Sequence, residues 1–408
     1  MDRLGRYYTK EFIGDLLVDQ MMDVEPTRIL DLGAGGGCLS FAASRRWTEA
    51  EMITVDVDDK VSTHLKELFS TRHGTRHSHI NADALSSTLP KLISLQTDAI
   101  DAAVCNPPFI TPKWRRGFGE ILEETGFSGC LPVTGTVDAA LLFLAQNLRL
   151  LSDQATLGII LPDSLVSSQK YRSFRRQLIE RYQLHRTIRL PRQSFNNTDA
   201  LAYIAIISKG RRTDTDIPLQ RLDKRFGLQE EILVSAEKAI ERLDFNYHFQ
   251  QAKVSVKSKN LISLATICVE IKRGSVCSSQ RYENETPALH TTDFKTIASG
   301  CWVDLAKRGF EKTSVDNGLV VAQAGDILMA RVGRNLESKV FGVHCGKSIV
   351  TDCVYVIRVP KEYRRSVLSQ LSSPKGRDWI ASRSYGVGAK QLSKSDLLEF
   401  PLNFFEAV

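Results

Sequence analysis

The first half of the chain alternates short apolar runs with longer segments whose apolar residues recur every three to four positions. The short runs have the length and composition of buried strands, and the longer segments have the period of helices. Strands that alternate with helices favour a parallel sheet covered by helices, so we predict an α/β, doubly wound Rossmann-like domain. The expected strands are residues 28–32, 51–55, 99–105, 155–161, 184–190 and 201–208, and the clearest helices are residues 139–151 and 171–182.

The pattern changes in the second half of the chain. A polar stretch at residues 209–216 interrupts the alternation, and a short helical pattern at residues 236–243 follows it. Farther on, short β-like runs are separated by glycine turns, which predicts a second, smaller domain that is α+β or β-rich. These runs are residues 263–271, 326–330 and 350–359. The expected parts are a catalytic domain at residues 1–210, a linker with a helical connection at residues 211–255, and the second domain at residues 256–408.

The composition, with 42% hydrophobic and 25% charged residues, is that of a globular protein. No apolar run approaches the roughly 20 residues that a membrane-spanning helix needs. The first residues also lack the charged-then-apolar pattern of a secretion signal. We therefore expect a cytoplasmic protein without membrane contact. The cysteines form no C-x-x-C pair, so we expect neither a metal site nor disulfides.

Positive charge is concentrated in the second half. Residues 1–250 carry 31 Lys and Arg against 32 Asp and Glu, a net charge of −1. Residues 251–408 carry 23 against 15, a net charge of +8. A basic module beside a neutral one is typical of a domain that binds a polyanion and is attached to a catalytic domain.

A glycine-rich turn follows the first expected strand, in the sequence Ile-Leu-Asp-Leu-Gly-Ala-Gly-Gly-Gly. Glycine lets the backbone approach a ligand where a side chain would block it, so Gly33, Gly35 and Gly37 are candidates for binding a cofactor. Asp31, in the same motif, joins them.

Two further acids follow the next segments. Asp56 ends the second expected strand, about 20 residues beyond the glycine turn, where an acid can hydrogen-bond both hydroxyls of a ribose. Asp83, in Asn-Ala-Asp, is placed to meet an adenine amine. The glycine turn by itself also fits a Rossmann domain that binds a nicotinamide dinucleotide.

The loop Asn106-Pro107-Pro108-Phe109 directly follows the strand expected at residues 99–105. With the glycine turn upstream, it resembles the Asn/Asp-Pro-Pro-aromatic loop of the amino-methylating DNA methyltransferases. The resemblance implies S-adenosyl-L-methionine as the cofactor and these four residues as catalytic, with Asn106 also beside the cofactor. Taken alone, Asn and Pro are also ordinary turn residues.

The chemistry of an aromatic amine explains these residue types. The lone pair of the amine is delocalised into the ring, which makes the nitrogen a poor nucleophile. The Asn106 side-chain oxygen and the Pro107 carbonyl can accept both N–H bonds and free that lone pair. Two consecutive prolines hold the carbonyl still, which preorganises the acceptors. Phe109 can stack on a base that has been flipped out of the duplex.

Three other stretches extend the resemblance over residues 5–208. Gly5-Arg6-Tyr7-Tyr8-Thr9, followed by a helical pattern at residues 12–21, looks like the N-terminal cofactor motif of the family and adds Tyr8 and Thr9, although the usual Thr-Pro is Thr9-Lys10 here. Residues 157–164 and Ser194-Phe195-Asn196-Asn197 look like two later motifs, which implies that Phe195 packs against the flipped base. An ordinary core aromatic is the other reading of Phe195. The order of motifs is that of the Taq-type N6-adenine enzymes.

The second half resembles one target-recognition domain of a type I restriction specificity subunit. The stretches that carry this resemblance are residues 241–247, 271–274, 324–333 and 388–392. The resemblance implies double-stranded DNA as a partner, a role in restriction–modification or related defence, and a separate restriction endonuclease or companion subunit.

Several basic residues are candidates for contacts with DNA. Lys113, Arg115 and Arg116 flank a tryptophan just past the catalytic loop, a combination that can clasp phosphates. Arg331 and Arg334 flank a glycine in an expected loop of the second half. Solvated surface charge remains an alternative for all five, and Arg172, Arg175 and Arg176 are expected to form a solvated helix face.

Two rival functions remain open. Protein glutamine N5-methyltransferases also carry Asn-Pro-Pro-aromatic, and a non-enzymatic DNA-binding modification partner could retain the cofactor site for structure. The basic second half and Phe195 argue against the first rival, and the intact loop at residues 106–109 argues against the second.

Overall fold

The computed structural model describes the chain in two compact units, Met1–His248 and Phe249–Val408. In the described residues no helix is both long and apolar enough to cross a membrane. The described residues are 9–21, 24–70, 76–131, 136–196, 198–210, 212–223, 225, 227–256, 261–283, 287–308 and 318–404.

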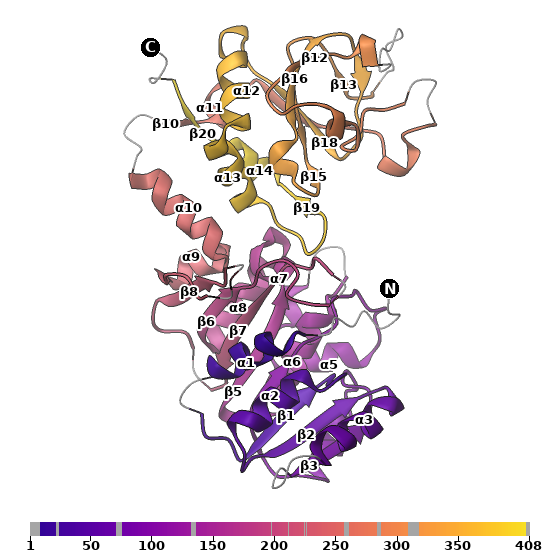
Figure 1. Ribbon diagram of the computed structural model, residues 1–408, viewed down its shortest axis with the longest axis vertical. Coiled ribbons are helices and arrows are strands. Elements are labelled where there is room, and N and C mark those ends of the chain that lie inside the picture. Colours follow the sequence, from indigo (N-terminus) through magenta and orange to yellow (C-terminus); the bar gives the residue numbers. More distant parts are fainter. Residues whose placement is uncertain are drawn as a thin grey trace. The chain divides into compact units, whose positions relative to one another are not determined.

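The first unit is built on a sheet with nine described strands in the order β3-β2-β1-β4-β5-β7-β6-β8-β9 (Figure 1). The strands from β3 to β5 in this order pair in parallel, and β7 and β9 run against their neighbours. The strands are β1 (Arg28–Leu32), β2 (Glu51–Asp56), β3 (His77–Asn81), β4 (Ile100–Cys105), β5 (Leu151–Pro162), β6 (Gln183–Arg189), β7 (Ala202–Ser208), β8 (Ile217–Arg221) and β9 (Ile232–Val234).

Helices connect the consecutive strands from β1 to β6, as the alternating pattern predicts. The central strands β1 and β4 are buried along nearly their whole length, since helices cover both faces of a doubly wound sheet. The helices of this unit are α1 (Glu11–Asp19), α2 (Cys38–Arg46), α3 (Asp59–Ser70), α4 (Leu89–Ser94), α5 (Gly117–Glu124), α6 (Ala139–Leu150), α7 (Asp163–Ser167), α8 (Arg172–Arg181) and α9 (Ala236–Glu241), and α10 (Phe245–Val256) crosses from the first unit into the second.

The strand order fixes where a ligand can bind. The chain builds β1, β2 and β3 toward one edge of the sheet and then returns to place β4 on the other side of β1. The loops after β1 and β4 therefore leave in opposite directions and open a crevice at the carboxyl ends of these strands. The glycine turn follows β1 and Asn106 follows β4, so both motifs lie at this switch point.

The segment expected to be a linker, residues 211–255, differs from that expectation. β8 pairs with β6 and β9 pairs with β8, so the chain continues the sheet after a short polar turn. The Leu243 amide donates to the Val166 carbonyl (3.1 Å), and the Thr187 hydroxyl donates to the Leu243 carbonyl (3.0 Å). Residues 241–247, one of the stretches that carry the resemblance to a recognition domain, thus lie in the first unit. A sequence does not show on which core such a short motif packs.

Arg175 is not part of a solvated face. Its guanidinium is buried and donates to four backbone carbonyls at 2.6–3.0 Å, of which two precede the Arg and two belong to α9 and its end. The acceptors are Leu165, Ser168, Ile240 and Glu241. Arg175 therefore ties α9 to α7 and α8, and its neighbour Arg176 stays exposed.

The second unit contains a five-stranded sheet of order β11-β18-β14-β16-β12, which is antiparallel except for the pair β12–β16. Together with its helices it is α+β. Its strands are β10 (Leu261–Ser263), β11 (Glu270–Arg273), β12 (Trp302–Asp304), β13 (Val321–Ala322), β14 (Ile327–Ala330), β15 (Val332–Gly333), β16 (Val340–Cys345), β17 (Ser348–Ile349), β18 (Val354–Arg358), β19 (Lys390–Gln391) and β20 (Pro401–Asn403), and its helices are α11 (Leu264–Ile267), α12 (Arg364–Ser372), α13 (Pro374–Arg383) and α14 (Lys394–Leu398).

This sheet has a hydrophobic core on each face. Successive side chains of a strand point to opposite faces. Ile327 and Met329 of β14 accordingly join the core that includes the apolar residues of α12, α13 and α14, and Leu328 joins the core on the other face. Because both faces are covered, β14 is a continuous apolar run rather than an alternating one.

Candidate active site

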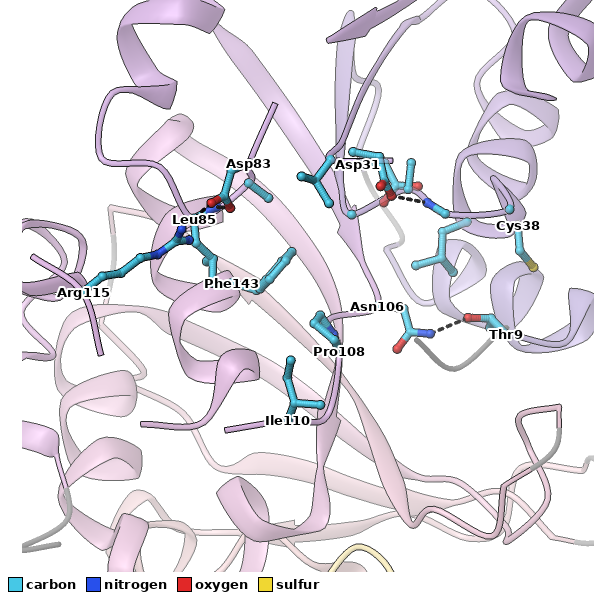
Figure 2. A pocket seen from close by; sticks show the side chains of 18 residues that line it. Thr9, Asp31, Cys38, Asp83, Leu85, Asn106, Pro108, Ile110, Arg115 and Phe143 are labelled. Carbon is cyan, nitrogen blue, oxygen red and sulfur yellow. Dashed lines mark hydrogen bonds and ion pairs between the residues drawn. The ribbon is translucent and has the colours of Figure 1, made fainter. Parts of the chain in front are cut away.

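A cavity of about 470 Å³ lies at the carboxyl ends of β1, β2, β3 and β4 (Figure 2). It brings together residues from distant parts of the sequence. The lining residues that the sequence singled out are Thr9, Asp31, Gly33, Gly35, Asp56, Asp83, Asn106, Pro108 and Arg115. The other lining residues are Ala34, Gly36, Cys38, Leu39, Val57, Ala84, Leu85, Ile110 and Phe143. Gly37, Pro107 and Phe109 are not among the lining residues, and Tyr8 lies outside the described residues.

The glycine turn needs glycine for two different reasons. Gly33, Gly35 and Gly37 all have positive φ, at 74°, 50° and 75°, a conformation that residues with a Cβ rarely adopt. A Cβ at Gly37 would also lie 2.4 Å from a methyl of Leu65, whereas at Gly35 the nearest atom would be 3.9 Å away. Gly37 is thus required for packing α2 against α3, and Gly35 leaves its backbone open to the cavity.

Asp56 is held in a fixed orientation at the end of β2. Its side chain is buried, and its two oxygens accept hydrogen bonds from the Gly35 and Asp58 amides, each at 2.9 Å. The carboxylate thereby links the glycine turn to β2. A carboxylate has further lone pairs, so Asp56 can also accept from hydroxyls of a ligand in the cavity. Val57, the next residue, is 56% exposed and offers an apolar surface to the same ligand.

Asp31 is an ionisable group with almost no access to water. The pKa of its carboxyl is raised to about 7. Burial is the main cause, the nearby Asp56 carboxylate adds to it, and a hydrogen bond from the Ser40 hydroxyl opposes both effects. The carboxyl is therefore partly protonated near neutral pH. A positive charge in the cavity would favour its ionised form.

Asp83 and Arg115 form an ion pair at one side of the cavity (Figure 2). Arg115 Nη1 lies 2.6 Å from Asp83 Oδ2, and Asp83 Oδ1 accepts from the Leu85 amide at 2.9 Å. The guanidinium of Arg115 also lies over the Phe118 ring, 4.9 Å from its centroid. Arg115, expected to contact DNA phosphate, is therefore part of the cavity wall in this structure.

Asn106 is positioned by β4, which it directly follows, and by Thr9. Its side-chain nitrogen donates to the Thr9 hydroxyl at 2.8 Å. This hydrogen bond turns the amide so that its carbonyl oxygen points away from Thr9 (Figure 2). The buried strand β4, ending at Cys105, holds the backbone of Asn106 in place.

Two aromatic rings meet beside Asn106. The centroids of Phe109 and Phe195 are 6.2 Å apart, with an interplanar angle of 80°. Phe195 is 2% exposed, and its backbone forms an isolated β-bridge with Thr9. The N-terminal motif, the loop at residues 106–109 and the motif at Phe195 thus converge, although their sequence order alone does not bring them together.

The remaining basic candidates fall into two groups. Lys113 and Arg116 are exposed on the segment between the loop at residues 106–109 and α5. In the second unit, the Arg331 side chain is held by a hydrogen bond, in which its Nε donates to the Asp352 carbonyl at 2.7 Å. Arg334 is exposed. Arg331 therefore supports the turn before β18, which leaves Arg334 as the more accessible of this pair.

Sequence reasoning missed several lining residues, of which Phe143 is the largest. It lies on α6, a helix that is buried on nearly all sides, and its ring is 3.1 Å from where a Cβ at Gly33 would stand. The apolar composition of α6 predicts burial but not which ring faces the cavity. Val57 had a usable signal, because it follows the acid that ends β2.

Known proteins resemble different lengths of this chain. The tRNA1(Val) (adenine(37)-N6)-methyltransferase of Flavobacterium psychrophilum is 24% identical over 122 residues, which is 30% of this chain and 50% of that protein. Among solved structures, the type IIG restriction endonuclease BpuSI has a TM-score of 0.54 at 14% identity, covering 100% of this chain and 60% of that one. A modification subunit of a putative type I restriction enzyme from Vibrio vulnificus YJ016 has a TM-score of 0.44 at 17% identity, covering 54% and 48%.

The likeness to BpuSI shows the fold over the whole chain. The chain spans half the length of the curated relative and 60% of the endonuclease. The model of the family described as N-6 DNA Methylase matches residues 1–259, more than half of the chain, and the chain therefore belongs to this family.

Proposed function

We propose that this protein transfers a methyl group from S-adenosylmethionine to the exocyclic N6 amine of adenine in double-stranded DNA, within a restriction–modification or related system. The observation that carries the proposal is the placement of Asn106. Its amide, oriented by Thr9, borders the cavity whose other walls carry the glycine turn and Asp56.

The cavity fits S-adenosylmethionine, the methyl donor that the family implies. Three acids, Asp31, Asp56 and Asp83, line it and suit a cationic ligand that also carries hydroxyls and an amine. Asp56 would hold the ribose hydroxyls, and the open backbone at Gly35 would face the ligand. When bound, S-adenosylmethionine supplies a methyl group on a sulfonium sulfur. The neutral thioether that remains after the transfer is a good leaving group.

The residues at the end of β4 would activate the amine. The Asn106 side-chain oxygen and the Pro107 carbonyl accept its N–H bonds and free the nitrogen lone pair. The Thr9 hydroxyl keeps the donor end of the amide away from the amine, so the acceptor end is presented without reorganisation. The proton that the methylated nitrogen loses passes to solvent, and no strong base is required.

Phe109 and Phe195 would receive the flipped adenine. Their rings already stand nearly perpendicular at 6.2 Å. A base that displaces this contact between the two rings gains a stacking surface from one ring and an edge contact from the other. Sequence-tolerant stacking of this kind suits a site that holds any flipped adenine and leaves the choice of sequence to another part of the chain.

The second unit would choose the DNA sequence. The net charge of +8 over residues 251–408 favours a polyanion, and the chemical motifs we identified all lie before residue 210. Lys113 and Arg116 would add phosphate contacts beside the flipped base. A separate nuclease or companion subunit would complete a restriction system.

The deciding experiment is a methyl-transfer assay with three substrates. The purified chain is incubated with radiolabelled S-adenosylmethionine and either double-stranded DNA, bulk tRNA or a protein extract, with the Asn106→Ala variant as the blank. We expect label in DNA alone, as N6-methyladenine. Label in tRNA would instead assign the substrate class named for the curated relative, and label in protein would favour glutamine methylation.

A further inference from the structure

The ion pair between Asp83 and Arg115 joins two loops that are not neighbours in the sheet. Asp83 follows β3, Arg115 follows β4, and β2 and β1 lie between these strands. A contact of 2.6 Å between the two side chains therefore closes a ring of loops around the cavity, which both residues line. Figure 2 shows the pair at the side of the cavity away from Thr9.

The segment that carries Arg115, residues 110–116, is called the strap here. It leaves the catalytic loop at Ile110, whose carbonyl accepts from the Ala139 amide at 2.9 Å. At its other end the buried Phe118 ring contacts both Arg115, at 4.9 Å, and the Trp114 ring, edge to face at 5.8 Å. The strap is thus held at both ends, and Arg115 reaches the cavity from a defined position.

The contribution of this pair to the stability of the fold is small. The side chains of Arg115 and Asp83 are 50% and 40% exposed, and exposed ion pairs contribute little to stability. The Leu85 amide fixes one oxygen of Asp83 at 2.9 Å, which leaves the other facing Arg115 and the cavity. A carboxylate oxygen can accept from a guanidinium and from a ligand amine together.

We infer that Arg115 is a cofactor-positioning residue. Its ion pair holds Asp83 for the adenine end of the cofactor and links cofactor binding to the position of the strap, and hence to the catalytic loop. The inference rests on the proposed function for the identity of the ligand. It assigns to Arg115 a role toward the cofactor in place of the phosphate contact expected from sequence.

Calorimetric titration with S-adenosylhomocysteine, without DNA, tests the first part. We expect Arg115→Gln to bind about tenfold more weakly, since a charge-assisted hydrogen bond is lost, and Arg115→Lys to bind with intermediate affinity. Asp83→Asn should also weaken binding, and the double variant should be no weaker than the weaker single one. Arg176→Gln removes the same charge from an exposed site on α8 and should bind as the wild type does.

Fluorescence of Trp114 tests the link to the strap. The difference between the wild type and Trp114→Phe isolates its emission from that of the other tryptophans. Saturating S-adenosylhomocysteine should change this emission in the wild type and leave it unchanged in Arg115→Gln.

Wild-type affinity in Arg115→Gln, additive losses in the double variant, or a full Trp114 response in saturated Arg115→Gln would each overturn the inference while leaving the proposed function intact. A wild type that binds no S-adenosylhomocysteine would overturn both.

Discussion

The Asn106 side-chain nitrogen donates to the Thr9 hydroxyl at 2.8 Å, across 97 residues of sequence. The contact joins the N-terminal motif to the loop at residues 106–109. Because an amide has a donor end and an acceptor end, a hydroxyl that accepts from the nitrogen decides which end of Asn106 is available to a substrate amine.

The first prediction concerns this contact. Asn106→Ala should lower turnover by about 10²-fold or more, the usual cost of losing one preorganised group, with S-adenosylhomocysteine affinity nearly unchanged. Thr9→Val should lower turnover less, Thr9→Ser should restore it, and Thr9→Val should have no effect in the Asn106→Ala background. Single-turnover methylation of DNA measures all four; independent effects of the two substitutions would show that Thr9 does not act through Asn106.

The second prediction concerns Asp56. Asp56→Ala should weaken S-adenosylhomocysteine binding by roughly 1–3 kcal/mol, because it removes the acceptor for the ribose and the link to the Gly35 amide. Asp59→Ala, at an exposed acid in the first turn of α3, is the matched control. Calorimetry on both variants decides the matter, and equal affinities would remove Asp56 from the cofactor site.

The third prediction follows from Asp31, whose pKa burial raises from 3.8 to about 7. The folded protein keeps this proton at pH values where the unfolded chain has lost it. The contribution of this bound proton to the free energy of unfolding is therefore fully present below pH 4. It is lost as the pH rises to 7, by roughly 1.4 kcal/mol per pH unit.

Asp31→Asn cannot ionise. The melting temperature of this variant minus that of the wild type should therefore increase from pH 5 to pH 7 and stay at the increased value above pH 7. A cationic cofactor favours the carboxylate, so wild-type affinity for S-adenosylmethionine should rise over the same interval and stay flat in the variant. A constant difference in melting temperature from pH 5 to pH 8 would contradict the raised pKa.

The fourth prediction separates packing from stacking at Phe195. Both Phe195→Ala and Phe195→Leu lose the aromatic face, which should weaken retention of the flipped base by about 1–3 kcal/mol. Phe195→Ala also leaves a cavity and should lower the melting temperature, whereas Phe195→Leu nearly conserves volume. The fluorescence of 2-aminopurine at the target position reports the flipped state. A normal signal in Phe195→Leu would leave Phe195 as an ordinary core residue.

The central elements could be predicted because burial on both faces leaves a clear apolar signal. β1 and β4 are such strands, and their ends carry the motifs. β3 was not predicted, since His77–Asn81 lies at the sheet edge and is largely polar. β8 and β9 are short strands at the opposite edge and give an equally weak pattern.

Side-chain partners were the least predictable feature of the site. From the sequence we expected Asp83 to contact an adenine amine and Arg115 to contact DNA phosphate. Nothing in a single sequence marks a contact between the loops that follow β3 and β4. Arg175 was misread for a related reason. A basic residue on a helix is usually solvated, and only the fold shows that backbone carbonyls of α9 and its end surround this one.

The last prediction concerns where the catalytic unit ends. A chain cut after Lys209, near the boundary expected from sequence, loses β8, β9 and α9. It also leaves one buried and one partly buried guanidinium group short of partners. Arg175 loses the carbonyls of residues 240 and 241, and Arg189 loses the buried Asp244 carboxylate at 2.8 Å.

Breaking a buried ion pair costs about 3–5 kcal/mol, a large part of the 5–15 kcal/mol that stabilises an ordinary domain. The chain cut after Lys209 should therefore melt without a cooperative transition and fail to bind S-adenosylhomocysteine. A chain cut after Val256, at the end of α10, keeps these contacts, so it should melt cooperatively at a temperature that the ligand raises. Should the shorter chain melt cooperatively and bind as tightly as the longer one, residues 211–248 would not belong to the catalytic unit.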